Sequence, residues 1–129
     1  MKLDQADIIF SKYIRLRDGK CMRCGSKVSF NENGDPVSHQ CSHFWGRRAE
    51  SVRYDGRNAE TLCGGCHLFL TANPSIHTEE KIQRLGQDEF DKLRIRAHTK
   101  VKKDRRAAMI YWREKYKELK KEREDETRV

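Results

Sequence analysis

Four of the five cysteines in this chain form two pairs whose spacing is typical of metal ligation. Cys21 and Cys24 form the first Cys-x-x-Cys pair, and Cys63 and Cys66 form the second, with 38 residues between the pairs. Four thiolates in this pattern predict a closed tetrahedral Zn²⁺ site, which would tie two distant segments together. Disulfides or a redox pair are the alternatives, and they fit a chain without a secretion signal poorly.

His43, Asn58 and His67 lie between or beside these pairs and could form an active site. A neutral histidine can take a proton from water, and a histidine on a helix can hold a divalent cation that clamps a phosphate. Hydrolysis of a phosphodiester needs both groups. Taken alone, His43 fits a core histidine on a strand, and His67 fits a helix cap or an extra residue of the zinc site. The order and spacing in which His43, Asn58 and His67 occur together favour catalysis over these separate roles.

The composition predicts a small core and a polyanionic partner. The chain has 129 residues, enough for one domain, of which 36% are hydrophobic and 37% charged. Because so few hydrophobic residues can form only a small core, a bound metal would help the chain to fold. The net charge of +8 suits nucleic acid. With no apolar run of membrane-spanning length and no signal-peptide pattern at the start, we expect a protein of the cytoplasm, either of its own cell or of a host.

The N-terminal half is predicted to combine one helix with short strands. Residues 4–17 are expected to form a helix that is capped by an aspartate, stopped by a glycine and packed over the first cysteine pair. Residues 37–44 are expected to form a strand with His39, Cys41 and His43 on one side. The fifth cysteine, Cys41, is then a small buried residue.

The remaining elements are predicted to be one short strand and several helices, which makes the fold class α+β. Residues 51–54 and 58–62 are expected to be extended, and a helix runs from residue 64 or 65 to about residue 72. Further helices are predicted at residues 78–85, 87–98 and 104–124. We expect a zinc-bound core at residues 1–86 and a basic helical extension at residues 87–129, either within the same domain or as an appendage.

The order His43, Asn58, Cys63-x-x-Cys66-His67 resembles the motif of the HNH endonucleases. The resemblance implies a small zinc-stapled ββα-metal (His-Me) finger, here surrounded by helices. In such a finger His43 would end the first strand as the general base. Asn58 would open the second strand and bond the backbone of the finger, and His67 would lie in the first turn of the helix and hold the catalytic metal.

A longer part of the chain resembles the NinG (Rap) recombination proteins of lambdoid phages. The residues that carry this resemblance lie at 14–24, 42–48, 52–58 and 63–66, within a shared stretch from about residue 8 to about residue 86. The resemblance implies a structure-specific endonuclease that acts on branched recombination intermediates. The HNH motif itself does not encode that substrate.

Ser42 departs from the HNH pattern, which often has a metal-binding aspartate just before the catalytic histidine. The NinG pattern often has glycine at this position and asparagine where this chain has His67. We therefore expect His67 to hold the catalytic metal with a substitute partner, for which His77 and His39 are candidates. Water and substrate oxygens would complete the shell of Mg²⁺ or Mn²⁺. A histidine-rich site favours Mn²⁺, Ni²⁺ or Zn²⁺ over Mg²⁺.

Two groups of basic residues are predicted to contact the DNA backbone. One group flanks the finger and the other precedes the last helix, and their alternative interpretation is a solvated surface. The first group is Arg47, Arg48, Arg53 and Arg57, and the second is Lys100, Lys102, Lys103, Arg105 and Arg106.

The sequence thus favours a metal-dependent DNA endonuclease of a phage, structure-specific for branched recombination intermediates. A nicking or packaging-associated HNH nuclease is the alternative among enzymes. The alternative from another class is a catalytically inactive zinc-ribbon DNA-binding protein, which Ser42 supports and which the retention of His43 and His67 opposes. Symmetrical cleavage of branched DNA usually needs two active sites, so a homodimer is favoured by analogy alone.

Overall fold

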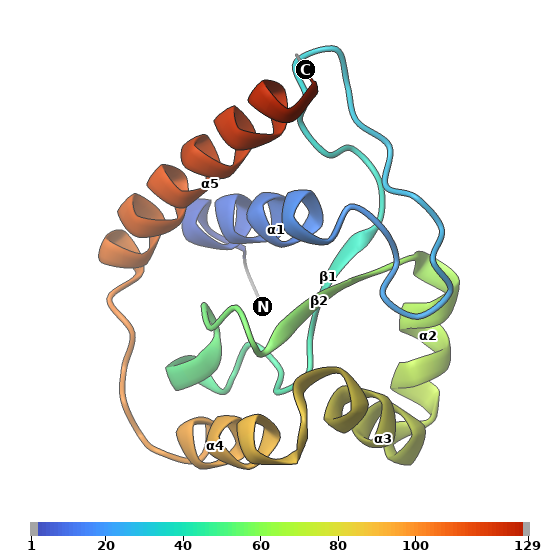
Figure 1. The fold of residues 1–129 in the computed structure, drawn as a ribbon. Helices are drawn as coiled ribbons and strands as arrows, with labels where there is room; N and C mark the ends of the chain where they lie inside the picture. The colour runs from blue at the N-terminus through green and yellow to red at the C-terminus, as the bar shows by residue number, and fades with distance from the viewer. Residues whose placement is uncertain (1–2, 128–129) are drawn as a thin grey trace.

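The computed structural model describes residues 3–127, in which five α-helices surround a two-stranded antiparallel hairpin. The elements are α1 (Gln5–Asp18), β1 (Gln40–His43), the 3₁₀ turn η1 (Glu50–Val52), β2 (Ala59–Leu62), α2 (Gly64–Ala72), α3 (Pro74–Leu85), α4 (Gln87–Ala97) and α5 (Arg105–Thr127). Figure 1 shows α1 and α5 on one side of the hairpin and α2, α3 and α4 on the other. The predicted α+β class with a long C-terminal helix is confirmed.

Helix α1 begins and ends where its sequence predicts. The Asp4 side chain accepts the Asp7 N–H at 3.0 Å, and the Asp7 carboxylate accepts the Asp4 N–H at 2.9 Å. Gly19 ends the helix in the left-handed conformation, with φ 67°. Phe10 and Ile14 are buried in the cluster that α1 shares with the hairpin. The helix therefore forms a fixed wall behind β1 and β2.

The hairpin divides the molecule because its side chains alternate between two faces. Cys41 faces α1 and joins its apolar cluster. Ser42 lies directly opposite Glu60 in the strand register, and the Glu60 carboxylate accepts a hydrogen bond from Arg84 of α3 at 2.6 Å. One face thus builds the core with α1, while the other faces α2 and α3.

The first strand is shorter than the predicted residues 37–44, since β1 spans only Gln40–His43. His39 has φ 67° and lies outside the strand, so the prediction that it shares a face with Cys41 and His43 is wrong. Its ring instead bonds the Ser38 hydroxyl at 2.8 Å and the Ser26 hydroxyl at 3.0 Å. These contacts place His39 next to the first cysteine pair.

Two further boundaries differ from the predictions. Residues 51–54 are not extended, because η1 and a turn occupy this part of the loop. Helix α3 begins at Pro74 rather than at Thr78. A proline fits the first turn of a helix, where its missing N–H needs no partner. The predicted helices after Gly86 are confirmed, with ends that differ by a few residues.

The C-terminal helix α5 packs against α1, and Figure 1 shows the two helices side by side. The Trp112 ring lies 5.0 Å from Phe10 and 4.9 Å from Tyr13, measured between ring centroids. Tyr116 is buried and donates its hydroxyl hydrogen to Asp35 at 2.6 Å. The predicted C-terminal extension therefore shares a core with the N-terminal part. Within residues 3–127, no helix has both the length and the apolar character needed to cross a membrane.

A buried ion pair ties α1 to the loop between the strands. Arg53 donates to both oxygens of Asp7, at 2.9 and 2.6 Å, and the two side chains are 0% and 2% exposed. Burial acts to raise the pKa of Asp7, but hydrogen bonds from Arg53 and from the Asp4 N–H, together with the Arg53 charge, outweigh it and hold that pKa at about 2.

We expect Asp7→Asn to lower the free energy of unfolding by about 3–5 kcal/mol, because it removes the nearest counter-charge of a buried guanidinium and leaves the more distant Glu50 carboxylate at 3.5 Å. Urea unfolding at pH 7 measures the loss. Glu118→Gln is the control, since it removes an exposed ion pair with Lys115 and should cost about 0–1 kcal/mol. As the pH falls from 3.8 through about 2, the wild type should lose the part of its unfolding free energy that ionised Asp7 contributes. Asp7→Asn should not show this pH-dependent loss. Equal losses in the two variants would contradict this.

Candidate functional site

The four paired cysteines converge at one point of the fold. Their sulfurs all lie within 4.8 Å of one another, and Cys24 Sγ is 3.8 Å from Cys63 Sγ. A tetrahedral Zn²⁺ ion with Zn–S bonds of about 2.3 Å places two ligand sulfurs about 3.8 Å apart. All five cysteines of the chain are free thiols. The cluster could therefore hold a metal such as zinc, as its spacing predicts.

The surroundings of the cluster favour thiolates at two positions. A hydrogen bond with Ser26 lowers the pKa of Cys24 to about 6, and the Cys66 N–H lowers the pKa of Cys63. Burial raises the pKa of Cys66 to about 12, but a thiol that coordinates a metal loses its proton outright. The donor set and its geometry therefore fit a structural zinc site.

His43 lies at the end of β1, where a backbone carbonyl holds one ring nitrogen. Its Nε2 is 2.9 Å from the Arg53 carbonyl oxygen. A carbonyl can only accept, so Nε2 carries the hydrogen and Nδ1 keeps its lone pair. Nδ1 is buried and has no hydrogen-bond partner among the described residues. Burial, followed by the charge of Arg47, lowers the pKa of His43 to about 4, so the ring is neutral at pH 7.

Asn58 closes the loop that carries the Arg53 carbonyl. It is fully buried, and its Oδ1 accepts the Trp45 N–H at 2.8 Å. Its Nδ2 donates to the carbonyls of Trp45 at 2.8 Å and Val52 at 3.2 Å. These bonds are to backbone atoms only. Asn58 therefore fixes the path of the loop and, through it, the orientation of the His43 ring.

His67 lies in the first turn of α2, and its Nδ1 is hydrogen-bonded to the side-chain oxygen of Gln40. An amide oxygen accepts, so the hydrogen is on Nδ1 and the lone pair is on Nε2. Histidines that bind metals usually donate their second N–H in this way. Burial and the charge of Arg47 lower the pKa of His67, which favours the neutral form that a metal requires.

His77 lies on α3 behind the hairpin, with its ring centroid 4.9 Å from that of Phe44. Its Nε2 is buried, has no hydrogen-bond partner among the described residues, and lies 3.9 Å from Glu60 Oε1. The Glu60 carboxylate is already engaged by Arg84, at 2.5 and 2.6 Å. Burial lowers the pKa of His77, so this ring also favours the neutral form.

A cavity of about 400 Å³ brings three of the predicted residues together, since His43, His67 and His77 all line it. Ser42 also lines this cavity, which we call the histidine cavity, whereas His39 does not. Apart from the four cysteines, the described residues hold no group of three or more histidine, cysteine or carboxylate ligands placed to hold a metal ion. A second metal would therefore depend on one or two side chains together with water and substrate oxygens.

Some of the basic residues predicted to contact DNA form ion pairs within the protein, and the others do not. Arg53 is fully buried against Asp7, so the prediction that it contacts DNA is wrong. Arg57 pairs with Glu89 at 3.1 Å. Arg105 pairs with Asp4 and Glu50 at 3.3 and 2.9 Å. Within residues 3–127, no ion pair involves the other six, which are Arg47, Arg48, Lys100, Lys102, Lys103 and Arg106.

The two basic groups meet in one concave surface. A groove is lined by Arg48 from the loop between the strands and by Lys100 and Lys102 from the segment after α4. The Trp45 and His98 rings lie 5.0 Å apart beside it. His98 lines the groove and Trp45 lines the histidine cavity, so their ring contact lies between the two. The segments are more than 40 residues apart in the sequence, so spacing alone could not reveal this surface.

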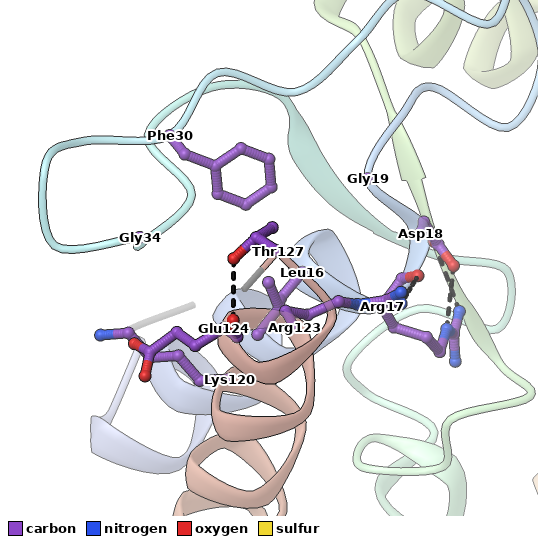
Figure 2. Close-up of a pocket in the computed structure, with 10 residues that line it drawn as sticks. All are labelled: Leu16, Arg17, Asp18, Gly19, Phe30, Gly34, Lys120, Arg123, Glu124 and Thr127. Atoms are coloured by element: carbon purple, nitrogen blue, oxygen red, sulfur yellow. Dashed lines mark hydrogen bonds and ion pairs between the residues drawn. The ribbon is translucent and has the colours of Figure 1, made fainter. Parts of the chain in front are cut away.

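A separate hollow of about 490 Å³ lies between the C-terminal ends of α1 and α5 and the loop at residues 30–34. Figure 2 shows its lining, which includes Phe30 over Leu16 and Thr127. Neither histidine nor cysteine lines it, and Asp18 is already bonded to Arg17 at 2.9 Å. It lacks convergent groups that could do chemistry, so the histidine cavity is the better functional candidate.

Sequence reasoning missed several supporting residues. Gln40, which orients His67, and Glu60, which lies behind His77, carried no spacing signal. The sequence position of Asp7 indicates only a favourable charge in the first turn of a helix. Their partners are 17 to 46 residues away in the sequence, so only the fold brings each pair together.

These features define a small α+β protein in which a four-cysteine cluster, a histidine cavity and an unpaired basic groove occur together. A family model described as "Bacteriophage Lambda NinG protein" matches residues 2–126, and the chain belongs to this family. No curated protein and no solved structure matches the chain significantly.

We expect one zinc ion per chain and expect Cys63→Ser to lose it, together with the cooperative unfolding transition, because metal-binding energy is here also folding energy. Zinc content by mass spectrometry and thermal unfolding by circular dichroism measure the two effects. Cys41→Ala is the control, since this thiol is buried but lies outside the cluster. A Cys63→Ser protein that retained full zinc and normal unfolding would contradict the assignment.

Proposed function

We propose that this protein is a metal-dependent HNH endonuclease that hydrolyses phosphodiester bonds in DNA, with branched recombination intermediates of a phage as its substrate. The observation that carries the proposal is the state of His43. Its Nε2 is bonded to the Arg53 carbonyl, and its unpartnered Nδ1 belongs to a ring that lines the same cavity as His67. The order strand, loop, strand and helix, with Asn58 closing the loop, supports an HNH finger.

His43 acts as the general base in this proposal. A water oxygen forms a new bond to phosphorus while one water proton moves to His43 Nδ1. The phosphorus bond to the 3′ oxygen breaks, its electron pair stays on that oxygen, and the oxygen takes a proton from solvent. Because the pKa of His43 is about 4, the ring is neutral and its Nδ1 lone pair is unprotonated over the whole physiological range.

His67 is the residue that we propose to hold the catalytic cation, through Nε2. When bound, a divalent ion would polarise the phosphate and stabilise the leaving oxygen. The hydrogen bond to Gln40 supports this role because it fixes the ring orientation. His77 is the second candidate ligand. Arg84 neutralises Glu60, so that carboxylate does not replace the aspartate that HNH enzymes often carry at the position of Ser42. Neutral nitrogen ligands favour Mn²⁺ or Ni²⁺ over Mg²⁺.

The unpaired basic residues supply the proposed DNA contact. Lysines and arginines without carboxylate partners remain free to bind phosphates, and the Trp45–His98 contact links the groove of Arg48, Lys100 and Lys102 to the histidine cavity. Lys103 and Arg106 follow in the sequence and are exposed, so they add positive charge to this part of the chain. Arg57 and Arg105 would have to exchange a carboxylate for a phosphate, so we expect smaller contributions from them.

A second candidate function is a zinc-containing DNA-binding protein without catalysis. Ser42 and the absence of a second three-ligand cluster among the described residues favour it. It explains the four cysteines and the basic groove equally well. It does not explain why a histidine beside the cavity keeps a buried nitrogen without a partner.

The proposal is tested by cleavage of supercoiled plasmid and of a four-way DNA junction with Mg²⁺, Mn²⁺ or Ni²⁺. We expect cleavage that falls about 10²–10⁴-fold in His43→Ala, as for loss of a general base. His39→Ala is the control, because this histidine lies outside the cavity. Zinc content of each variant separates loss of folding from loss of chemistry. DNA binding without cleavage under any metal would establish the second candidate instead, and the ratio of junction to plasmid cleavage distinguishes a resolvase from a nickase.

A further inference from the structure

Arg47 combines a partly buried side chain with the absence of an ion pair among the described residues, whereas Arg48, which also lacks one, is exposed. Arg47 lies in the loop four residues after His43. Its Nε is buried without a hydrogen-bond partner among residues 3–127, where no carboxylate pairs with it either. Arg53 and Arg105, from the same region, each hold a carboxylate.

The position of Arg47 is set by the same bonds that set His43. Trp45, two residues earlier, has both its N–H and its carbonyl bonded to the Asn58 side chain at 2.8 Å. Residues 42–46 line the histidine cavity, and Arg47 follows them directly in the chain, so it lies at the edge of the cavity that contains the proposed base and the proposed metal ligand. After burial, the Arg47 charge is the next cause that lowers the pKa of both His43 and His67, which agrees with this position.

The Nε–H of Arg47 is a buried donor without a partner among the described residues, which is unfavourable in the free protein. Burying a donor in this way costs stability, and an anion that binds there recovers the loss. The planar guanidinium matches the paired oxygens of a phosphate. Ser42 lines the cavity where HNH enzymes often have an acidic ligand, so no carboxylate at that position competes for the guanidinium. The surroundings thus select a phosphate group.

We propose that Arg47 is a catalytic residue that binds the non-bridging oxygens of the scissile phosphate and stabilises the negative charge that develops on them. The inference rests on the proposed nuclease function and deepens it. Arg47 would supply fixed positive charge at a centre whose metal has few protein ligands. Its role differs from that of Arg48, which lines the outer groove and would grip the DNA backbone.

The test compares Arg47→Ala, Arg47→Lys and Arg48→Ala in single-turnover cleavage at saturating protein, with DNA affinity measured separately in Ca²⁺. Arg113→Ala, on the exposed face of α5, controls for the loss of one positive charge. We expect Arg47→Ala to lower the cleavage rate by about 10²–10³-fold, with a change in the DNA dissociation constant below about tenfold. Arg47→Lys should retain an intermediate rate, because it keeps the charge but loses the planar guanidinium that can donate two parallel hydrogen bonds to a phosphate. Arg48→Ala should change affinity more than rate.

The outcomes separate this inference from the proposed function. A wild type that cleaves, with Arg47→Ala within a few-fold of Arg113→Ala, overturns the role of Arg47 and leaves the nuclease intact. An Arg47→Ala defect that appears only in affinity reduces Arg47 to a backbone contact and also overturns the inference. A wild type that binds DNA and never cleaves overturns the nuclease itself. Equal zinc content in all variants excludes misfolding as the cause of a lost rate.

Discussion

The buried ion pair between Asp7 and Arg53 is the interaction on which the proposed active site most depends. Charges this deep are tolerated only when they are paired and hydrogen-bonded, and both conditions are met here. The Arg53 side chain is fixed by α1, while its backbone carbonyl accepts the His43 N–H. One residue therefore connects a helix outside the finger to the imidazole that would do the chemistry. Asn58 fixes the same loop from its other end.

The cysteine cluster and the hairpin position the other parts of the proposed site. Cys63 follows β2 and caps α2, so a metal held there fixes the helix that carries His67 relative to the strands. One face of the hairpin builds the core with α1 and α5, whereas Ser42 on the other face and His43 at the end of β1 line the histidine cavity. A chain with 36% hydrophobic residues can hold such a cavity because polar bonds, and a metal if the four-cysteine cluster binds one, supplement a small core.

Features with a local signal could be predicted from the sequence. The cysteine spacing predicts the cluster, and Asp4 and Gly19 predict the ends of α1, because capping depends on neighbouring residues. Burial of a charged residue leaves no such signal. By residue type and position in the sequence, Arg53 therefore fits a DNA contact. Only the fold shows that its guanidinium is already bound to Asp7. The alternation before β1 likewise predicts too long a strand, because the turn at His39 depends on contacts with a distant serine.

The central claim is that the loop presents His43 as a neutral imidazole with its hydrogen on Nε2 and its lone pair free on Nδ1. The most direct measurement is nitrogen-15 NMR of histidine-labelled protein across a pH titration. We expect His43 to show a protonated Nε2 and an unprotonated Nδ1 at pH 7, and to stay neutral until the pH approaches about 4. A hydrogen on Nδ1, or a charged ring at pH 7, would contradict this arrangement and remove His43 as the general base.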